Sequence, residues 1–342
     1  MHRGLIVGKF MPLHRGHQLL IESALAKVDD LTVVIYDNTP PGHYPAMPID
    51  LRMKWLRELY PNLENIVPRS DPLPADMSQE ERDEPKYADL YARDLDFLGP
   101  FDYVFSSEEY GDPFAEALGA ESVVVDLARK TLPISGTQIR ENLYENRGWI
   151  DPLVYRSLIK KVVFVGTESA GKSTLAKAMA EEMDTEWVHE YGRELWEAQG
   201  LTGSFADLLK IATNQYRREE AAALHSREFL FCDTNAWTTL QWSLMYNDTA
   251  DARLYDLVEK TKDEYVWILC RNDFGWVDDG TRELRGIKSL EFQHQIKQAL
   301  INLGVEWYEV KGGLEERVAT VRQICYNVTN DEVSSRVRSG SL

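Results

Sequence analysis

The segment 160–174, KKVVFVGTESAGKST, restricts the fold more than any other part of the chain. It has the spacing G-x-x-x-x-G-K-S of a phosphate-binding P-loop, between an apolar strand-like run and a helix-like run. Glycines are required because the backbone N–H groups of the loop must face phosphate oxygens. The pattern predicts a nucleoside triphosphate site formed by Gly166, Ser169, Gly171, Lys172, Ser173 and Thr174.

Composition limits the remaining possibilities. The 342 residues are enough for two domains, and 44% hydrophobic with 27% charged residues is typical of a soluble globular protein. No apolar run reaches the roughly 18 residues of a membrane span, and the first residues lack the design of a signal peptide, so we expect a cytoplasmic protein. A formal net charge of -18 argues against a broad nucleic-acid-binding surface. DNA binding is therefore not expected.

A second strand–loop–helix pattern stands at the start of the chain. The apolar run 4–7 is followed by GKFMPLHRGH and then by a helical pattern over residues 18–27. His14 and His17 are three residues apart at the first turn, so both imidazoles can face one point near the helix N-terminus. Because anions are favoured at that point, it is a candidate phosphate site.

These residues resemble the H-x-G-H signature of the nucleotidyltransferase superfamily, whose members transfer an AMP or CMP group onto a phosphate. A second motif of that superfamily, I-S-x-T-x-x-R, occurs as residues 134–140, and Ser135 or Thr137 is expected to cap a helix over residues 138–146. The resemblance implies that four side chains bind the phosphates of ATP: His14, His17, Lys9 and Arg140.

The segments GKFMPLHRGH, SSEEYG and VVVDLARKTLPISGTQIR resemble the nicotinamide-mononucleotide adenylyltransferases. In the pantetheine branch of the superfamily, a threonine would be expected in place of His14. The resemblance implies further contacts to the adenine nucleotide from Gly8, Phe10, Ser107, Asp126, Arg129, Ser135 and Thr137. A strand over residues 31–36 ends at Asp37 and Asn38, which we expect to help bind the acceptor, because ligands collect at the carboxyl ends of strands in open α/β sheets.

The second half alternates predicted strands, 162–165, 186–189, 229–232, 265–270 and 305–310, with helical segments, which indicates a parallel α/β domain. Asp233 ends an apolar strand in a Walker-B-like arrangement, so Ser173 and Asp233 are the predicted Mg²⁺ ligands. Glu190 also follows a strand. Glu190 is the first candidate for the base that activates an acceptor hydroxyl, and Asp233 is the second.

The segment 276–282, WVDDGTR, follows the fourth of these strands, where small-molecule kinases have a mobile lid. Arg282 could close over the phosphates. We expect the acceptor to contact Tyr191, Arg193, Trp276 and Asp278. Two further aromatic residues, Trp196 and Trp237, are candidates to stack on a cationic ring, although each aromatic here fits a packing role as well.

The segments GTESAGKST, HEYGRE, CDTN and WVDDGTR resemble the ribosylnicotinamide kinase domain of NadR-type proteins, which join that domain to a nicotinamide-mononucleotide adenylyltransferase in this order. The resemblance implies a Rossmann-like nucleotidyltransferase domain over residues 1–152, a P-loop kinase domain over 153–330 and a tail over 331–342. It also implies phosphorylation of nicotinamide riboside to NMN and adenylylation of NMN to NAD, with ATP as co-substrate and Mg²⁺ as cofactor. Many relatives carry a helix-turn-helix segment in front, which this sequence lacks, so repressor function is not expected.

Two alternatives remain at this stage. A bifunctional coenzyme A synthase also joins an H-x-G-H adenylyltransferase to a P-loop kinase, but its kinase lacks the EYGRE and WVDDGTR segments. A nicotinamide-nucleotide sensor with little turnover would bind the same ligands, and intact catalytic motifs argue against it. The sequence leaves homo-oligomer formation and the preference for the amide or the acid nucleotide open.

Overall fold

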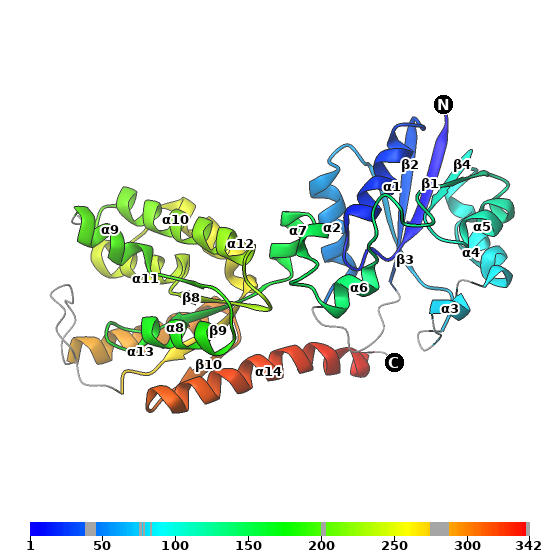
Figure 1. The fold of residues 1–342 in the computed structure, drawn as a ribbon. Helices are drawn as coiled ribbons and strands as arrows, with labels where there is room; N and C mark the ends of the chain where they lie inside the picture. Colours follow the sequence, from blue (N-terminus) through cyan, green and yellow to red (C-terminus); the bar gives the residue numbers. More distant parts are fainter. Residues whose placement is uncertain are drawn as a thin grey trace. The chain divides into compact units, whose positions relative to one another are not determined.

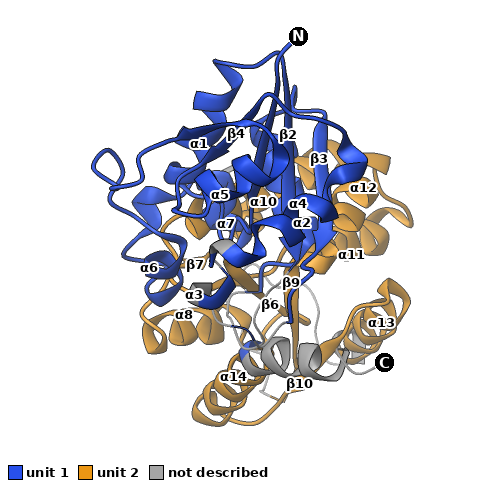
Figure 2. Cartoon of the chain, turned by 90° about the vertical axis from the view of Figure 1, so that its right-hand side faces the viewer, with its two compact units in different colours: residues 1–158, 329–342 blue, residues 159–328 orange. Residues whose placement is uncertain are grey.

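The computed structural model describes residues 1–37, 46–74, 77, 79–82, 84–199, 203–273 and 287–339. They group into unit 1, Met1–Leu158 with Thr329–Leu342, and unit 2, Ile159–Val328 (Figure 2). The expected boundary at residue 152 falls at the first residue of helix α7 (Pro152–Ser157), which groups with unit 1. Helix α14 (Leu314–Ser339) continues through most of the expected tail, because its sequence contains neither glycine nor proline.

Unit 1 is built on one parallel sheet with the strand order β3-β2-β1-β4-β5 (Figure 1). The strands are β1 (Arg3–Gly8), β2 (Asp30–Asp37), β3 (Asn65–Ser70), β4 (Tyr103–Ser106) and β5 (Glu121–Val124). The helices are α1 (Arg15–Leu25), α2 (Ile49–Leu59), α3 (Gln79–Arg82), α4 (Ala88–Asp94), α5 (Gly111–Leu118), α6 (Gly136–Glu141) and α7. Chain order and sheet order together confirm the predicted Rossmann-like arrangement.

Buried residues on both faces of the strands explain why this sheet is covered on each side. Leu5, Val34 and Tyr36 share a core with Phe114 of α5. Side chains alternate along a strand, so the buried Val33 faces the opposite side. There, α1 and α2 contact β2. Continuous apolar runs are typical of parallel strands buried on both faces.

Strand β3 has no counterpart among the predicted elements. Its sequence, NIVPRS, contains Pro68, which lacks the N–H group that a central strand must donate to its neighbour. In the structure, β3 lies at the edge of the sheet and pairs only with β2 among the described strands. An edge position tolerates proline, so the sequence pattern alone gave a weak signal for this strand.

Unit 2 is a second parallel sheet, with the order β10-β9-β6-β8-β7. Its strands are β6 (Lys160–Val165), β7 (Trp187–Val188), β8 (Phe229–Asp233), β9 (Tyr265–Cys270) and β10 (Trp307–Val310). Its helices are α8 (Lys172–Glu182), α9 (Tyr191–Gln199), α10 (Phe205–Ala223), α11 (Ala236–Asn247), α12 (Ala252–Thr261), α13 (Ile287–Leu303) and α14. All five predicted strands are present, with ends that differ by a few residues.

Two apolar layers hold this sheet. On one face, Phe164 and Phe231 pack with Met179 of α8 and Ile324 of α14. On the other face, α10 contacts β8, and Trp237 of α11 meets a strand tryptophan edge to face. The cysteines Cys232, Cys270 and Cys325 are buried free thiols. Within the described ranges, no helix is both long and apolar enough to span a bilayer.

Candidate functional site

The loop between β1 and α1 places both predicted histidines at the start of a helix. His14 is the N-cap of α1, and its Nδ1 accepts a hydrogen bond from the Gly16 N–H at 3.1 Å. The Nδ1 atom of His17 accepts one from the His14 N–H at 3.3 Å. Because each Nδ1 is an acceptor, each neutral ring carries its proton on Nε2. The two ring centroids are 3.9 Å apart, so the imidazoles form one pair.

Both imidazoles are held in the neutral form. Burial, followed by the charges of Arg129 and Arg140, lowers the pKa of His14 to about 4. Burial, followed by the charge of His14, lowers the pKa of His17 well below its usual value, while a hydrogen bond to the Pro12 backbone acts in the opposite direction. Positive charge at this site therefore comes from the arginines, and the histidines act as neutral hydrogen-bond donors.

Gly16, between the two histidines, is required by close packing. A Cβ atom at this position would lie 2.9 Å from Cε1 and 3.0 Å from Nδ1 of His14. The imidazole cannot retreat without lengthening its bond to the Gly16 N–H. In the H-x-G-H motif, the first histidine therefore caps the helix, and its ring packs directly against the glycine whose N–H it accepts.

The second motif lies against this loop, although it is far away in the sequence. Ser135 caps α6, as predicted, and α6 ends at Glu141, several residues before the predicted end. The Arg140 Nη1 donates to the Met11 carbonyl oxygen at 2.6 Å, and its Nη2 donates to the Thr137 hydroxyl at 3.0 Å. Arg140 is therefore fixed by both motifs and lies beside the imidazole pair.

Arg52 supports this site and was not among the predicted site residues. Its side chain is fully buried and donates to the carbonyl oxygens of Lys9 at 2.8 Å and Tyr36 at 3.1 Å, and to Asp37 Oδ1 at 2.7 Å. It thereby joins the ends of β1 and β2 and orients the Asp37 carboxylate. Asn38, the other predicted acceptor residue, lies outside the described residues.

Asp126 and Arg129 form a turn next to the histidines. The Asp126 carboxylate accepts backbone N–H groups from Thr131, Leu132 and Lys130, and these bonds lower its pKa. Its oxygens therefore shape the turn. That Asp126 also contacts a nucleotide stays a prediction. Arg129 pairs with Glu108, with 2.8 Å between Nη2 and Oε1.

Three other predicted nucleotide contacts surround the same loop. Gly8 is the last residue of β1, and Ser107 follows the last residue of β4. The ring centroid of Phe10 is 4.8 Å from that of His17. Because β1 and β4 are parallel neighbours, their carboxyl ends meet at one edge of the sheet. Their contacts with a nucleotide stay predictions, and because the Phe10 side chain is 1% exposed, its contact would come from the backbone.

In unit 2, the predicted P-loop connects β6 to α8. Gly166 has φ +143°, and a Cβ atom there would lie 2.7 Å from the carbonyl oxygen of Cys270. Gly171 is the N-cap of α8, with φ +81°. Both conformations favour glycine. The Lys172 Nζ donates to the carbonyl oxygens of Gly166 at 3.1 Å and Thr167 at 2.8 Å, so its ammonium lies within the loop.

Arg317 holds the P-loop from a distant helix and was not predicted. It is buried in α14 and donates to the carbonyl oxygens of Ala170 at 2.6 Å, Arg271 at 2.8 Å and Gly312 at 2.9 Å. These bonds fix the loop to the ends of β9 and β10. No local sequence signal identifies such a residue, because it lies 147 positions after Ala170.

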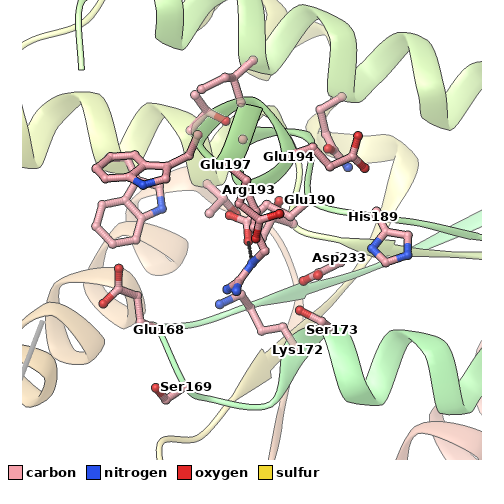
Figure 3. A pocket seen from close by; sticks show the side chains of 18 of the residues that line it. Glu168, Ser169, Lys172, Ser173, His189, Glu190, Arg193, Glu194, Glu197 and Asp233 are labelled. Atoms are coloured by element: carbon pink, nitrogen blue, oxygen red, sulfur yellow. Dashed lines mark ion pairs between the residues drawn. The ribbon is translucent and has the colours of Figure 1, made fainter. Parts of the chain in front are cut away.

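The P-loop opens into a cavity of about 1210 Å³ (Figure 3). Most of the predicted kinase residues line it, namely Ser169, Gly171, Lys172, Ser173, Thr174, Glu190, Arg193 and Asp233. Three predicted residues, Trp276, Asp278 and Arg282, lie outside the described residues. The described part of the kinase site is therefore brought together in one place.

Two carboxylates in this cavity, Asp233 and Glu190, interact electrostatically. Asp233 is 1% exposed, and burial raises its pKa, while Lys172 and a hydrogen bond from Ser173 act in the opposite direction. Its Oδ1 is buried without a hydrogen-bond partner. Burial and the charge of Asp233 raise the pKa of Glu190, whose Oε2 is 3.8 Å from Nε of Arg193 (Figure 3). Two neighbouring acids thus have different surroundings.

Some of the aromatic candidates line the cavity, and others are packed in the core. Trp196 lines the cavity. Trp237 is 3% exposed and packs against Trp267, so the packing interpretation is the correct one for this residue. Tyr191 lies under the Arg218 guanidinium, 4.5 Å from its ring centroid. Trp242, which was not predicted, also lines the cavity and stacks on a neighbouring tyrosine at 5.7 Å.

Comparison with known proteins agrees with this division. The cytidylyltransferase-like family matches residues 5–142, and the AAA domain family matches residues 161–317. Two proteins described as trifunctional NAD biosynthesis/regulator protein NadR are similar over 333 residues, which cover 90% of this chain and 78% of each relative. The protein of Escherichia coli (strain K12) is 29% identical, and that of Salmonella typhimurium (strain LT2) is 30% identical.

Solved structures share the fold of the whole chain. A NadR protein in complex with NR has a TM-score of 0.51 and 22% identity, covering 91% of this chain and 90% of that one. A NadR protein in complex with NAD and AMP-PNP has a TM-score of 0.53 and 22% identity, covering 96% of each chain. A relative that is 30% identical and is covered over 78% of its length shows the family: the chain belongs to the NadR family of NAD biosynthesis proteins.

Proposed function

We propose that unit 2 phosphorylates nicotinamide riboside with ATP and that unit 1 transfers the adenylyl group of a second ATP to the resulting mononucleotide, forming NAD and pyrophosphate. Membership of the NadR family supports this assignment. The observation that carries it is that each unit contains its own phosphate-binding loop with the charges its reaction needs. Unit 1 has an imidazole pair beside Arg140, and unit 2 has Lys172 beside two carboxylates.

In the adenylyl step, a phosphate oxygen of the mononucleotide attacks the α-phosphorus of ATP, and the bond to pyrophosphate breaks. The attacking oxygen is already ionised, so no general base is required. The neutral His14 can donate its Nε2–H hydrogen bond to the α-phosphate without changing its protonation state. His17 can do the same when its Nε2–H exchanges the Pro12 backbone for a phosphate oxygen. Arg140 supplies the positive charge that stabilises the departing pyrophosphate. Catalysis is then positioning and charge neutralisation.

In the kinase step, the 5′-hydroxyl attacks the γ-phosphorus, and the bond to the β,γ-bridging oxygen breaks. The hydroxyl proton must move to a base. Burial raises the pKa of both carboxyl groups, so their contacts distinguish them. Asp233 accepts a hydrogen bond from Ser173, whereas Glu190 Oε2 lies 3.8 Å from Arg193 Nε, so Glu190 fits the role of the base better. Lys172 neutralises charge on the β- and γ-phosphates.

Asp233 and Ser173 fit a Mg²⁺ ion. A buried carboxylate oxygen without a partner, next to a hydroxyl at the end of a P-loop, matches the oxygen ligands that Mg²⁺ prefers. Among the described residues, no cluster of three or more His, Cys, Asp or Glu side chains could hold a metal alone. This agrees with a site that phosphates help to complete. When bound, Mg²⁺ would neutralise charge on the transferred phosphate.

The test is NAD formation from nicotinamide riboside, ATP and Mg²⁺. Lys172→Ala should stop NAD formation from the riboside but not from the mononucleotide, whereas His17→Ala should stop both. Turnover indistinguishable from a protein-free control, together with binding of the nucleotides, would support the sensor alternative. Phosphorylation and adenylylation of coenzyme A precursors in place of the nicotinamide compounds would reassign both substrates.

A further inference from the structure

Two polar side chains on the helical wall of the kinase cavity have buried atoms without partners. Gln215, on α10, is 1% exposed, and its Nε2 has no hydrogen-bond partner. Thr238, on α11, is 6% exposed, and its Oγ1 has none either. Both residues line the cavity, and α10 packs against α11. Neither atom takes part in the mechanism described above.

The orientation of the Gln215 amide is determined by its other end. Its Oε1 accepts the Tyr191 backbone N–H at 2.9 Å, so the Nε2 group is left as a donor. A buried donor without an acceptor is costly. Native proteins retain few such groups, and one that lines a binding cavity can be satisfied by a bound ligand. The missing partner is therefore an oxygen or another acceptor atom that arrives with a ligand.

The positions of Gln215 and Thr238 indicate which part of the acceptor nucleoside contacts them. Gln215 binds the residue next to Glu190, the proposed base, which must reach the 5′-hydroxyl. Thr238 lies in the first turn of α11, which follows the Asp233 end of β8. The sugar is the part of a nucleoside attached directly to the 5′-carbon, whereas the ring carboxamide lies beyond the glycosidic bond. Sugar hydroxyls are therefore the nearest acceptors.

We propose that the Gln215 amide nitrogen and the Thr238 hydroxyl bind the sugar hydroxyls of the acceptor nucleoside and thereby select ribosides over deoxyribosides. The inference rests on the proposed kinase function. A site that hydrogen-bonds a substrate hydroxyl discriminates strongly against an analogue that lacks it, because the buried donor is then left unpaired. Each lost bond should lower kcat/KM by about 10- to 100-fold.

The experiment measures kcat/KM for nicotinamide riboside and for its 2′-deoxy and 3′-deoxy analogues in four proteins. These are the wild type, Gln215→Met, Thr238→Val and the control Gln298→Met, whose side chain is exposed on α13 outside the cavity. Gln215→Met is close in size and removes the amide donor without adding a charge or a new acceptor for a sugar hydroxyl. It also removes the acceptor of the Tyr191 N–H, but that loss affects riboside and deoxyriboside alike and cancels in the ratio of their kcat/KM values.

Gln215→Met and Thr238→Val should each reduce the preference for the riboside over at least one deoxy analogue by about 10-fold or more, and the KM for ATP should not change. Gln298→Met should retain the wild-type preference. Thr238→Val should also melt no lower than the wild type, because it removes an unpaired hydroxyl. Lower activity together with unchanged or higher stability distinguishes ligand binding from a structural role.

Equal losses on riboside and deoxyribosides, or a wild type that does not discriminate between them, would overturn the proposal. Failure of the wild type to phosphorylate the riboside would refute the kinase function separately. In that case, calorimetry measures the affinities of the same three nucleosides. Tighter binding of the riboside would support the sugar contact, and equal affinities or no binding would overturn it.

Discussion

Replacing Gly16 by alanine should disable adenylyl transfer while leaving the kinase intact. The new Cβ atom would lie 2.9 Å from Cε1 of His14, whereas ordinary contact begins at 3.4 Å. The imidazole must therefore retreat by roughly 0.5 Å. That movement stretches the 3.1 Å hydrogen bond from the residue 16 N–H to Nδ1 and changes the distance from His14 to His17.

The size of the effect follows from two terms. Overpacking in a closely packed site costs about 1–3 kcal/mol, and loss of the helix cap costs about 1 kcal/mol more. Catalysis should suffer more than stability, because a displacement of about 1 Å at a reacting group can lower the rate by about 10²-fold. For the smaller displacement here, we expect kcat to fall by about 10- to 100-fold.

The assay compares NAD formation from the mononucleotide with ADP release from the riboside in the same preparation. Gly148→Ala is the matched control, because a Cβ atom at residue 148 of the same unit meets no atom within 4 Å. Gly16→Ala should lose the first activity and keep the second. If Gly16→Ala formed NAD as fast as Gly148→Ala, the imidazole position would not determine the rate, and the argument from H-x-G-H packing would be wrong.

Three further outcomes follow from charges in the structure. Because burial lowers the pKa of His14 to about 4, its ionisation should leave the adenylyl-transfer rate unchanged from about pH 6 to pH 9, as a pH–rate profile would show; an inflection near 6.5 that His14→Asn removes would contradict this. Asp233→Asn should slow riboside phosphorylation and raise the Mg²⁺ concentration that this step needs, while NAD formation from the mononucleotide stays unchanged; a slower kinase step with an unchanged Mg²⁺ dependence would contradict the metal role. Burial raises the pKa of Glu219 to about 7, so the folded state binds its proton more tightly than the unfolded state. The free energy of unfolding should therefore fall by up to about 3 kcal/mol as pH rises from 4.5 to 7. Glu219→Gln can still accept the Tyr265 hydroxyl, and it should make this fall smaller. Urea titrations at several pH values measure both.

The parts that the sequence predicted well are those in which local spacing determines the geometry. Gly166, Gly171 and Lys172 form a P-loop because a strand, a glycine-containing turn and a helix start follow one another directly. The capping contacts of His14 and His17 are local in the same way. Such contacts depend on neighbouring residues and little else, so the pattern in the sequence carries most of the information.

The residues that were missed act over long distances. Arg52 and Arg317 are buried arginines on helices, and each donates to carbonyl oxygens of loops remote in sequence. The sequence pattern does not distinguish Gln215 and Thr238 from other helix residues. Only the packing of two helices shows that they line a cavity. A helical pattern predicts which face is buried. It does not predict which buried polar atom will lack a partner.

The two sites differ in how they prepare for a ligand. In unit 1, Arg140 is satisfied by the Met11 carbonyl and the Thr137 hydroxyl, and each histidine accepts a backbone N–H, so the site is largely built without its substrates. In unit 2, Asp233 and Gln215 keep buried atoms without partners. Such groups lower the stability of the free protein and return that free energy when a ligand satisfies them. The kinase cavity therefore has more to gain from binding, which suits a site that must select one nucleoside among many before it commits ATP.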